Sequence, residues 1–271
     1  MYEKMVQTAN PGLILILLDQ SQSMEEAYSG STKMNLATLA IRRCIYEIIN
    51  ACKSGEAIKN RCQIGVYGYG SGAASLLIGG WVSDVFHLKI GEESIPRKVS
   101  DGAGGLVDSP LILPIFRGLE PKAKGNTPMD LAFDEARNLI EKTWLPKFLD
   151  SFPPIVINIT DGEPDDIPSA TRSAKSLMSL KANDGNVLLF NAHISSANAG
   201  ELSLPSSLPS SVASNKFVHF LFDISSEIPA PLYPRAEQAG LQPEPGARGC
   251  LYRADAELLT KMIVFGSNPM R

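Results

Sequence analysis

The sequence predicts a doubly wound α/β fold, with a mostly parallel central sheet, one antiparallel edge strand and helices on both faces. Strand-like and helix-like segments alternate along nearly the whole chain, which is typical of this class. The first strand, Leu13 to Leu18, is continuously apolar, as expected for a parallel strand buried on both faces. The strand from Gln63 to Tyr69 is followed closely by another, Ala74 to Val82, and such a hairpin predicts the antiparallel edge.

The other elements follow from periodicity and end signals. An apolar stripe at helical spacing predicts a helix from about Lys33 to Lys53, and a second stripe predicts one from Pro128 to about Phe148. The remaining predictions are a strand at Ile155 to Thr160, a helix at Ser169 to Lys181, strands at Asn186 to Ile194 and Lys216 to Phe222, and a final helix at Asp255 to Phe265. In the segment 83–126, we expect a loop at 101–105 and a short irregular element at Leu111 to Phe116.

Length and composition limit the class of protein. With 271 residues, 44% apolar and 20% charged, the chain is expected to form one globular domain over 1–271, with an N-terminal extension at 1–10 and a Pro-rich loop within it at 228–249. The net charge of −4 and the absence of any Lys/Arg run longer than Arg42-Arg43 argue against a nucleic-acid partner.

The cellular setting is predicted from what the sequence lacks. No apolar run is long enough for a signal sequence or a membrane span, so we expect a cytoplasmic protein with no membrane partner. The cysteines at 44, 52, 62 and 250 form no Cys-x-x-Cys pair, so zinc and redox chemistry have no support. Buried thiols in a reducing compartment are the better interpretation.

Three polar motifs carry the functional prediction. Asp19, Ser21 and Ser23 follow the first strand, and the carboxyl end of such a strand is where open α/β folds place ligands. Thr127 begins the second predicted helix, and Asp161 ends another buried strand. These carboxylate and hydroxyl oxygens suit a hard cation such as Mg²⁺. Taken singly, each motif has a structural alternative: a polar turn at Asp19 or Asp161, and a helix N-cap at Thr127.

Together, Asp19-x-Ser21-x-Ser23, Thr127-Pro-Met and Thr-Asp161-Gly resemble the metal-ion-dependent adhesion site of von Willebrand factor A domains, and look most like bacterial intracellular members. The resemblance implies a bound Mg²⁺, with Mn²⁺ or Ca²⁺ as alternatives. It assigns Ser21, Ser23 and Thr127 to direct ligation, and Asp19 and Asp161 mainly to ligation through water. Two positions depart from the family pattern, because Gln22 and Asn126 stand where glycine is usual.

The resemblance implies a binding function. A metal ion held mainly by neutral hydroxyls attracts a carboxylate from outside, so the expected partner is a protein that presents Asp or Glu. Loops at 24–32, 101–126 and 162–168 would supply specificity. We expect an adaptor in an intracellular signalling, defence or ATPase-associated assembly, with no catalytic residues. The alternative is a phosphatase-like, metal-dependent hydrolase, against which stands the lack of an evident general base in the motifs.

Overall fold

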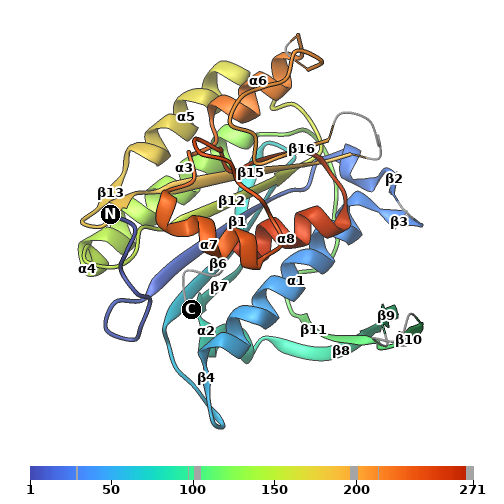
Figure 1. Ribbon diagram of the computed structural model, residues 1–271, viewed down its shortest axis with the longest axis vertical. Coiled ribbons are helices and arrows are strands. Elements are labelled where there is room, and N and C mark those ends of the chain that lie inside the picture. Colours follow the sequence, from blue (N-terminus) through green and yellow to red (C-terminus); the bar gives the residue numbers. More distant parts are fainter. Residues whose placement is uncertain (29, 97, 101–104, 196–200, 213, 267–271) are drawn as a thin grey trace.

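A central mixed sheet organises the chain in the computed structural model, which describes residues 1–28, 30–96, 98–100, 105–195, 201–212 and 214–266 (Figure 1). Its seven strands among these residues run in the order β16-β17-β15-β12-β1-β6-β7. Neighbours from β17 to β6 pair in parallel, while β7 is antiparallel to β6. The strands are β1 (Gly12–Asp19), β6 (Cys62–Gly70), β7 (Ala73–Trp81), β12 (Ile155–Thr160), β15 (Leu188–Ile194), β16 (Leu202–Ser203) and β17 (Cys250–Ala254).

The apolar strand β1 lies in the middle of this sheet, and its alternate side chains enter two cores. Ile14, Ile16 and Leu18 pack with the helices of one face, whereas Leu15 and Leu17 pack with those of the other. The predicted doubly wound fold and its antiparallel edge are therefore confirmed, and the second edge also ends in a short antiparallel strand, β16.

Helices cover both faces of the sheet (Figure 1). One face carries α1 (Lys33–Cys52), α2 (Val82–Phe86), α7 (Tyr233–Gln238) and α8 (Ala256–Gly266), and the other carries α3 (Met129–Leu139), α5 (Ile167–Ser179) and α6 (Lys216–Asp223). The predicted second helix is one continuous rod in which α3 passes through a π-helical turn, η2 (Ile140–Trp144), into α4 (Leu145–Phe148). Pro146 follows that turn, and a proline disturbs the hydrogen bonding of the preceding helical turn.

Two predictions in the C-terminal third are wrong. The segment Lys216 to Phe222 is the helix α6 and not the last strand. Asn215 caps it by accepting hydrogen bonds from the backbone N–H groups of Phe217 and Val218, and the buried positions follow a helical spacing. The last strand is β17, which the sequence did not reveal. The segment 228–249 is also more ordered than a loop, since it contains η3 (Ala230–Leu232) and α7.

A further correction concerns the segment after α2. The predicted irregular element is a regular strand, β11 (Leu111–Phe116), which pairs antiparallel with β8 (Lys89–Ile95). This pair extends away from the central sheet and is followed at its tip by β9 (Lys98–Ser100) and β10 (Leu106–Asp108) (Figure 1). Of the loop predicted at 101–105, residues 101–104 lie outside the described part of the chain.

The remaining elements are short. They are η1 (Gln22–Glu25), β2 (Ala27–Tyr28), β3 (Ser31–Thr32), β4 (Lys53–Ser54), β5 (Ala57–Ile58), β13 (Lys181–Ala182) and β14 (Gly185–Asn186). All four cysteines are buried, as predicted. Among the described residues, the chain has no helix of the length and apolarity that a membrane crossing requires.

Candidate metal centre

The first predicted ligand, Asp19, is the last residue of β1 and is fully buried. Its carboxylate accepts a hydrogen bond of 2.8 Å from the backbone N–H of Ser21 and one of 2.6 Å from the hydroxyl of Thr160, at the end of β12. Burial raises the pKa of Asp19 to about 6, and these hydrogen bonds only partly oppose the effect. Asp19 is thus held between two strand ends, where burial disfavours its ionised form.

The two serines connect Asp19 to Asp161. The Oγ atoms of Ser21 and Ser23 are 3.1 Å apart, and Ser23 donates a 2.7 Å hydrogen bond to Oδ1 of Asp161. Ser23 sits in the turn η1, which Met24 anchors by burying its side chain completely. The loop after β1 and the loop after β12 are therefore joined through the predicted ligands themselves.

The third predicted loop is bonded to both of the others. The N–H of Thr127 donates to Oδ1 of Asp165 at 3.0 Å, and the Thr127 carbonyl accepts from the Asp165 N–H at 3.1 Å. On its other side, the Gly125 carbonyl accepts a 3.0 Å hydrogen bond from the N–H of Gln22. Thr127 is only 7% exposed. The three loops thus form a closed ring around the ends of β1 and β12.

Close backbone approach explains why glycines stand at this edge. Gly125 has a φ of +83°, and a Cβ there would lie 2.7 Å from the Cα of Ser71 in the β6–β7 turn. A Cβ on Gly70, the last residue of β6, would lie 2.8 Å from the carbonyl oxygen of Gln20. Glycine therefore lets the hairpin support two of the three loops.

The helix cap predicted as an alternative role for Thr127 is absent. Helix α3 begins at Met129, the cap position belongs to Pro128, and no side chain caps it. The simple-turn alternatives for Asp19 and Asp161 also fall short, because both carboxylates bond to residues from distant segments. The structure accordingly brings Asp19, Ser21, Ser23 and Asp161 into one cluster and ties the Thr127 loop to it.

Lys33, which the sequence analysis did not single out, is a buried member of the cluster. It is the first residue of α1, its side chain is 8% exposed, and its Nζ lies 2.8 Å from Oδ2 of Asp161 and 2.5 Å from Oε2 of Glu26. Burial tends to lower the pKa of Lys33, but hydrogen bonds to these two carboxylates raise it overall. Lys33 is therefore a fixed cation within the predicted ligand set.

His193, at the end of β15, lies behind Asp161. Its Nδ1 accepts a 3.1 Å hydrogen bond from the Arg253 N–H, its ring bonds to the Asp161 backbone, and it stacks on Tyr252. Burial lowers the pKa of His193 to about 4, so the ring is neutral at pH 7. With both nitrogens engaged, His193 positions the Asp161 loop.

The donor set fits a hard divalent cation. Hydroxyl and carboxylate oxygens converge, and such oxygens are the ligands that Mg²⁺, Mn²⁺ and Ca²⁺ take in proteins. In the described part of the chain, no group of three or more His, Cys, Asp or Glu side chains is arranged to hold a metal. A metal here would therefore depend on Ser21, Ser23 and Thr127 as well as on the two aspartates.

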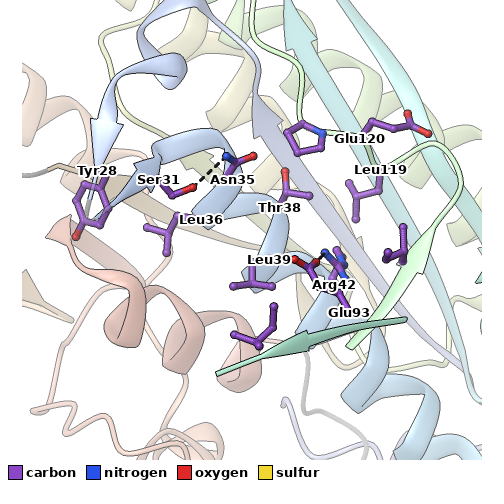
Figure 2. A pocket seen from close by; sticks show the side chains of 13 residues that line it. Tyr28, Ser31, Asn35, Leu36, Thr38, Leu39, Arg42, Glu93, Leu119 and Glu120 are labelled. Atoms are coloured by element: carbon purple, nitrogen blue, oxygen red, sulfur yellow. Dashed lines mark hydrogen bonds and ion pairs between the residues drawn. The ribbon is translucent and has the colours of Figure 1, made fainter. Parts of the chain in front are cut away.

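A groove lies between α1 and the β8–β11 hairpin (Figure 2). Its volume is about 550 Å³. Arg42 crosses it, donating to Glu93 of β8 at 2.6 Å and to the Pro114 carbonyl of β11 at 2.8 Å, so the arginine fastens the hairpin to α1. Tyr28 of β2 and Ser31 of β3 line the other end (Figure 2).

Comparison with known proteins gives structural relatives only. No protein-family model matches the sequence, and no curated protein matches it. Among solved structures, the pilus adhesin SpaC from Lactobacillus rhamnosus GG is similar with a TM-score of 0.50 and 14% identity, over 82% of this chain and 28% of that one. The SpRpn10 VWA domain matches with a TM-score of 0.44 and 12% identity, over 80% and 83%. Manganese-loaded TRAP protein from Plasmodium vivax matches with a TM-score of 0.36 and 15% identity, over 67% and 57%.

Coverage differs among these structures. The chain spans less than a third of the SpaC chain, and one fifth of a chain comprising three N-terminal domains of the type V pili tip protein Mfa5 from Porphyromonas gingivalis, which it also matches. At such identities the likeness concerns the fold alone. This likeness agrees with the strand order and with the three loops at the carboxyl ends of β1 and β12. The chain therefore has the fold of von Willebrand factor A domains.

Proposed function

We propose that this protein is a metal-dependent protein-interaction module. Ser21, Ser23 and Thr127 would bind a divalent ion directly, and Asp19 and Asp161 mainly through water. Mg²⁺ is the expected ion, with Mn²⁺ or Ca²⁺ as alternatives. One observation carries the proposal: three loops from distant parts of the chain are hydrogen-bonded into a ring that gathers hydroxyls and carboxylates at one edge of the sheet.

The partner follows from the ligand chemistry. Three neutral hydroxyls leave a bound divalent ion with unneutralised charge, and an open coordination position then favours an incoming carboxylate. The proposed partner is therefore a protein that presents Asp or Glu. A binding role agrees with the name of the similar structure SpaC, which is a pilus adhesin. The net charge of −4 is unsuited to nucleic acid.

The biological setting is part of the proposal. We place the domain formed by 1–271 in the cytoplasm, as an adaptor in a bacterial signalling, defence or ATPase-associated assembly, with no membrane partner. All four cysteines are free thiols, which agrees with a reducing compartment, because disulfides form and persist mainly in oxidising ones.

The hydrolase alternative gains nothing from the geometry. A hydrolase that activates metal-bound water needs a general base with a nitrogen or carboxylate oxygen directed at that water. His193 is the histidine beside Asp161, and both of its nitrogens are already hydrogen-bonded within the protein. His193 is therefore not available as that base, and we propose binding rather than hydrolysis.

The direct test is calorimetry with Mg²⁺ and Mn²⁺ on the wild type and on the double variant Ser21→Ala/Ser23→Ala. We expect saturable binding to the wild type and its loss in the variant. Glu163→Gln is the matched control, because Glu163 is an exposed acid in the Asp161 loop that the proposal leaves out of the ligand set. Equal binding by all three proteins would place the metal elsewhere and end the proposal.

A second test addresses the partner. Proteins captured from the native cell by the wild type should be released by EDTA, and Asp161→Asn should fail to capture them with metal present. The captured protein should then lose binding when one of its exposed Asp or Glu residues is replaced by Asn or Gln. A partner fully retained in EDTA would show that recognition does not use the ion.

A further inference from the structure

The starting observation is a buried ammonium at the head of a helix. Lys33 is the first residue of α1, directly after Thr32, whose side chain caps the helix by accepting from the Asn35 N–H. The residue as a whole is only 6% exposed. A cation is unfavourable at a helix N-terminus, where the backbone dipoles are positive, and it is unfavourable in a buried place unless a partner compensates it. Both conditions work against a lysine at position 33.

Two carboxylates compensate the ammonium. Asp161, whose side chain is completely buried, accepts at 2.8 Å, and Glu26, whose side chain is 64% exposed, accepts at 2.5 Å. The Lys33 N–H also donates to the Glu26 carbonyl at 3.2 Å, which holds the two residues together through the backbone. Lys33 is therefore shared between an inner acid of the site and an outer acid at its rim.

The inner contact bears directly on the metal site. Asp161 uses Oδ1 to accept from Ser23, a proposed metal ligand, and uses Oδ2 to accept from Lys33. An ion bound by Ser23, whether or not a water separates it from Asp161, would thus share this carboxylate with the ammonium, and two cations that close repel each other. The charge of Asp161 is available in full to only one of them.

We propose that Lys33 is a built-in cation of this site, competing with the divalent ion for Asp161. This inference rests on the metal site proposed above. Without metal, the ammonium neutralises Asp161 and holds the loop after β12 against α1. When the ion binds, Lys33 moves outward to Glu26, which is exposed and already in contact with it. Lys33 thereby sets the affinity for the metal, and it keeps the empty site folded.

The test is to remove the charge and measure metal affinity and metal-free stability together. Lys33→Met keeps the length of the side chain and removes the ammonium. By calorimetry, we expect Mg²⁺ and Mn²⁺ to bind at least about tenfold more tightly than to the wild type, since a repelling charge is gone. In EDTA, the melting temperature of Lys33→Met should be lower than that of the wild type. Added Mg²⁺ should raise the melting temperature of Lys33→Met by more than it raises that of the wild type.

Three controls isolate the cause. Lys33→Arg keeps the charge and should retain the affinity of the wild type within about threefold. Lys147→Met makes the same change in net charge at an exposed residue at the far end of the α3–α4 rod, and should leave metal binding unchanged. If Lys33→Met does not fold without metal, Lys33→Gln removes the ammonium but keeps a neutral N–H donor for the buried Asp161 carboxylate.

The outcomes separate this inference from the proposed function. Equal affinity in Lys33→Met and the wild type, with binding still lost in Ser21→Ala/Ser23→Ala, would overturn the competition and leave the metal site intact. Weaker binding by Lys33→Met would also overturn it, because the lysine would then be assisting the ion. Absence of binding in the wild type and in Lys33→Met alike would overturn both proposals.

Discussion

Two groups of polar side chains are buried in the centre of this protein, and they differ in charge. A neutral network joins Tyr69, Asn158, Asn191 and Ser225 through hydrogen bonds of 2.8, 3.1 and 3.0 Å, all of them fully buried. It crosses the sheet from β6 to the end of α6. The candidate metal centre, at the carboxyl ends of the same strands, contains two buried carboxylates and one ammonium.

The difference indicates two roles. In the neutral network each amide has its partners, and such a network favours one arrangement of strands without leaving a charge unbalanced. In the metal centre, burial raises the pKa of Asp19 to about 6, so the site is held in an arrangement that is unfavourable for the apo protein. Perturbed groups of that kind are typical of ligand sites. We therefore expect the network to determine stability and the metal centre to determine binding.

The largest expected effect is on the network. Asn158→Ala removes both the acceptor of the Tyr69 hydroxyl and the donor to Asn191, leaving the buried Asn191 Oδ1 without that donor and the Tyr69 hydroxyl with only its contact to Thr160. We expect a loss of about 2–4 kcal/mol in the free energy of unfolding, equal in EDTA and in Mg²⁺, as measured by urea denaturation. Tyr69→Phe, which deletes only one donor, should lose about half as much. A loss that appears only in Mg²⁺ would erase the distinction between the two regions.

The next effect has the opposite sign and concerns the metal centre. Asp19→Asn removes a buried charge while keeping the shape of the side chain, so the metal-free protein should become more stable at pH 7, by roughly 1–3 kcal/mol. Metal binding should be lost. Thermal unfolding in EDTA measures the first result and calorimetry the second. Destabilisation of the apo protein would make Asp19 a structural residue, like those of the network.

The gain in stability of metal-free Asp19→Asn over the wild type should depend on pH. The folded-state pKa of Asp19 is about 6, above its ordinary value of 3.8, so protonation of Asp19 favours the folded state. Its contribution to stability is fully present below pH 3.8 and is lost as the pH rises through 6. The advantage of Asp19→Asn over the wild type in EDTA should therefore be largest at pH 7 and shrink progressively from pH 6 towards pH 4. An advantage independent of pH would mean that the charge of Asp19 is not its cause.

The sequence predicted the parts of the fold that local patterns encode. The run Leu13 to Leu18 identified a central strand, because burial on both faces leaves no polar position, and the apolar stripes of α1 and α3 were continuous enough to place both helices. The segment 216–222 misled because a densely apolar run suits a buried strand as well as a short buried helix. The cap by Asn215 and the spacing of the buried positions distinguish the two in the folded chain. Strand β17 is defined by its pairing with β15, which is 56 or more residues away, and no local pattern reports such a contact.

The candidate site shows the same limit. Asp19, Ser21, Ser23, Thr127 and Asp161 were predicted because they follow strands or begin a helix in a recognisable order, although their ligand roles remain predictions. Lys33 was missed, since a lysine at the start of a helix usually faces solvent and only the folded chain brings Asp161 to it. Asp165 was missed for the same reason, because its link to Thr127 joins residues 38 positions apart.

The smallest expected effects are those of replacing two neighbouring acids, Asp165 and Asp166, in the loop after β12. Asp165 is exposed but holds the Thr127 loop, whereas the adjacent Asp166 caps α5 by accepting from the Ser169 N–H at 3.2 Å. Asp165→Ala should therefore change stability by less than about 1 kcal/mol and weaken Mg²⁺ binding by about tenfold, as expected when a support of a ligand is removed. Asp166→Ala should do the reverse, losing about 1 kcal/mol of stability through the cap without changing metal affinity. Calorimetry and urea denaturation on the pair measure both quantities. If the two variants bind Mg²⁺ equally, the Thr127 loop does not need its tie to Asp165, and the ring of three loops is looser than its hydrogen bonds indicate.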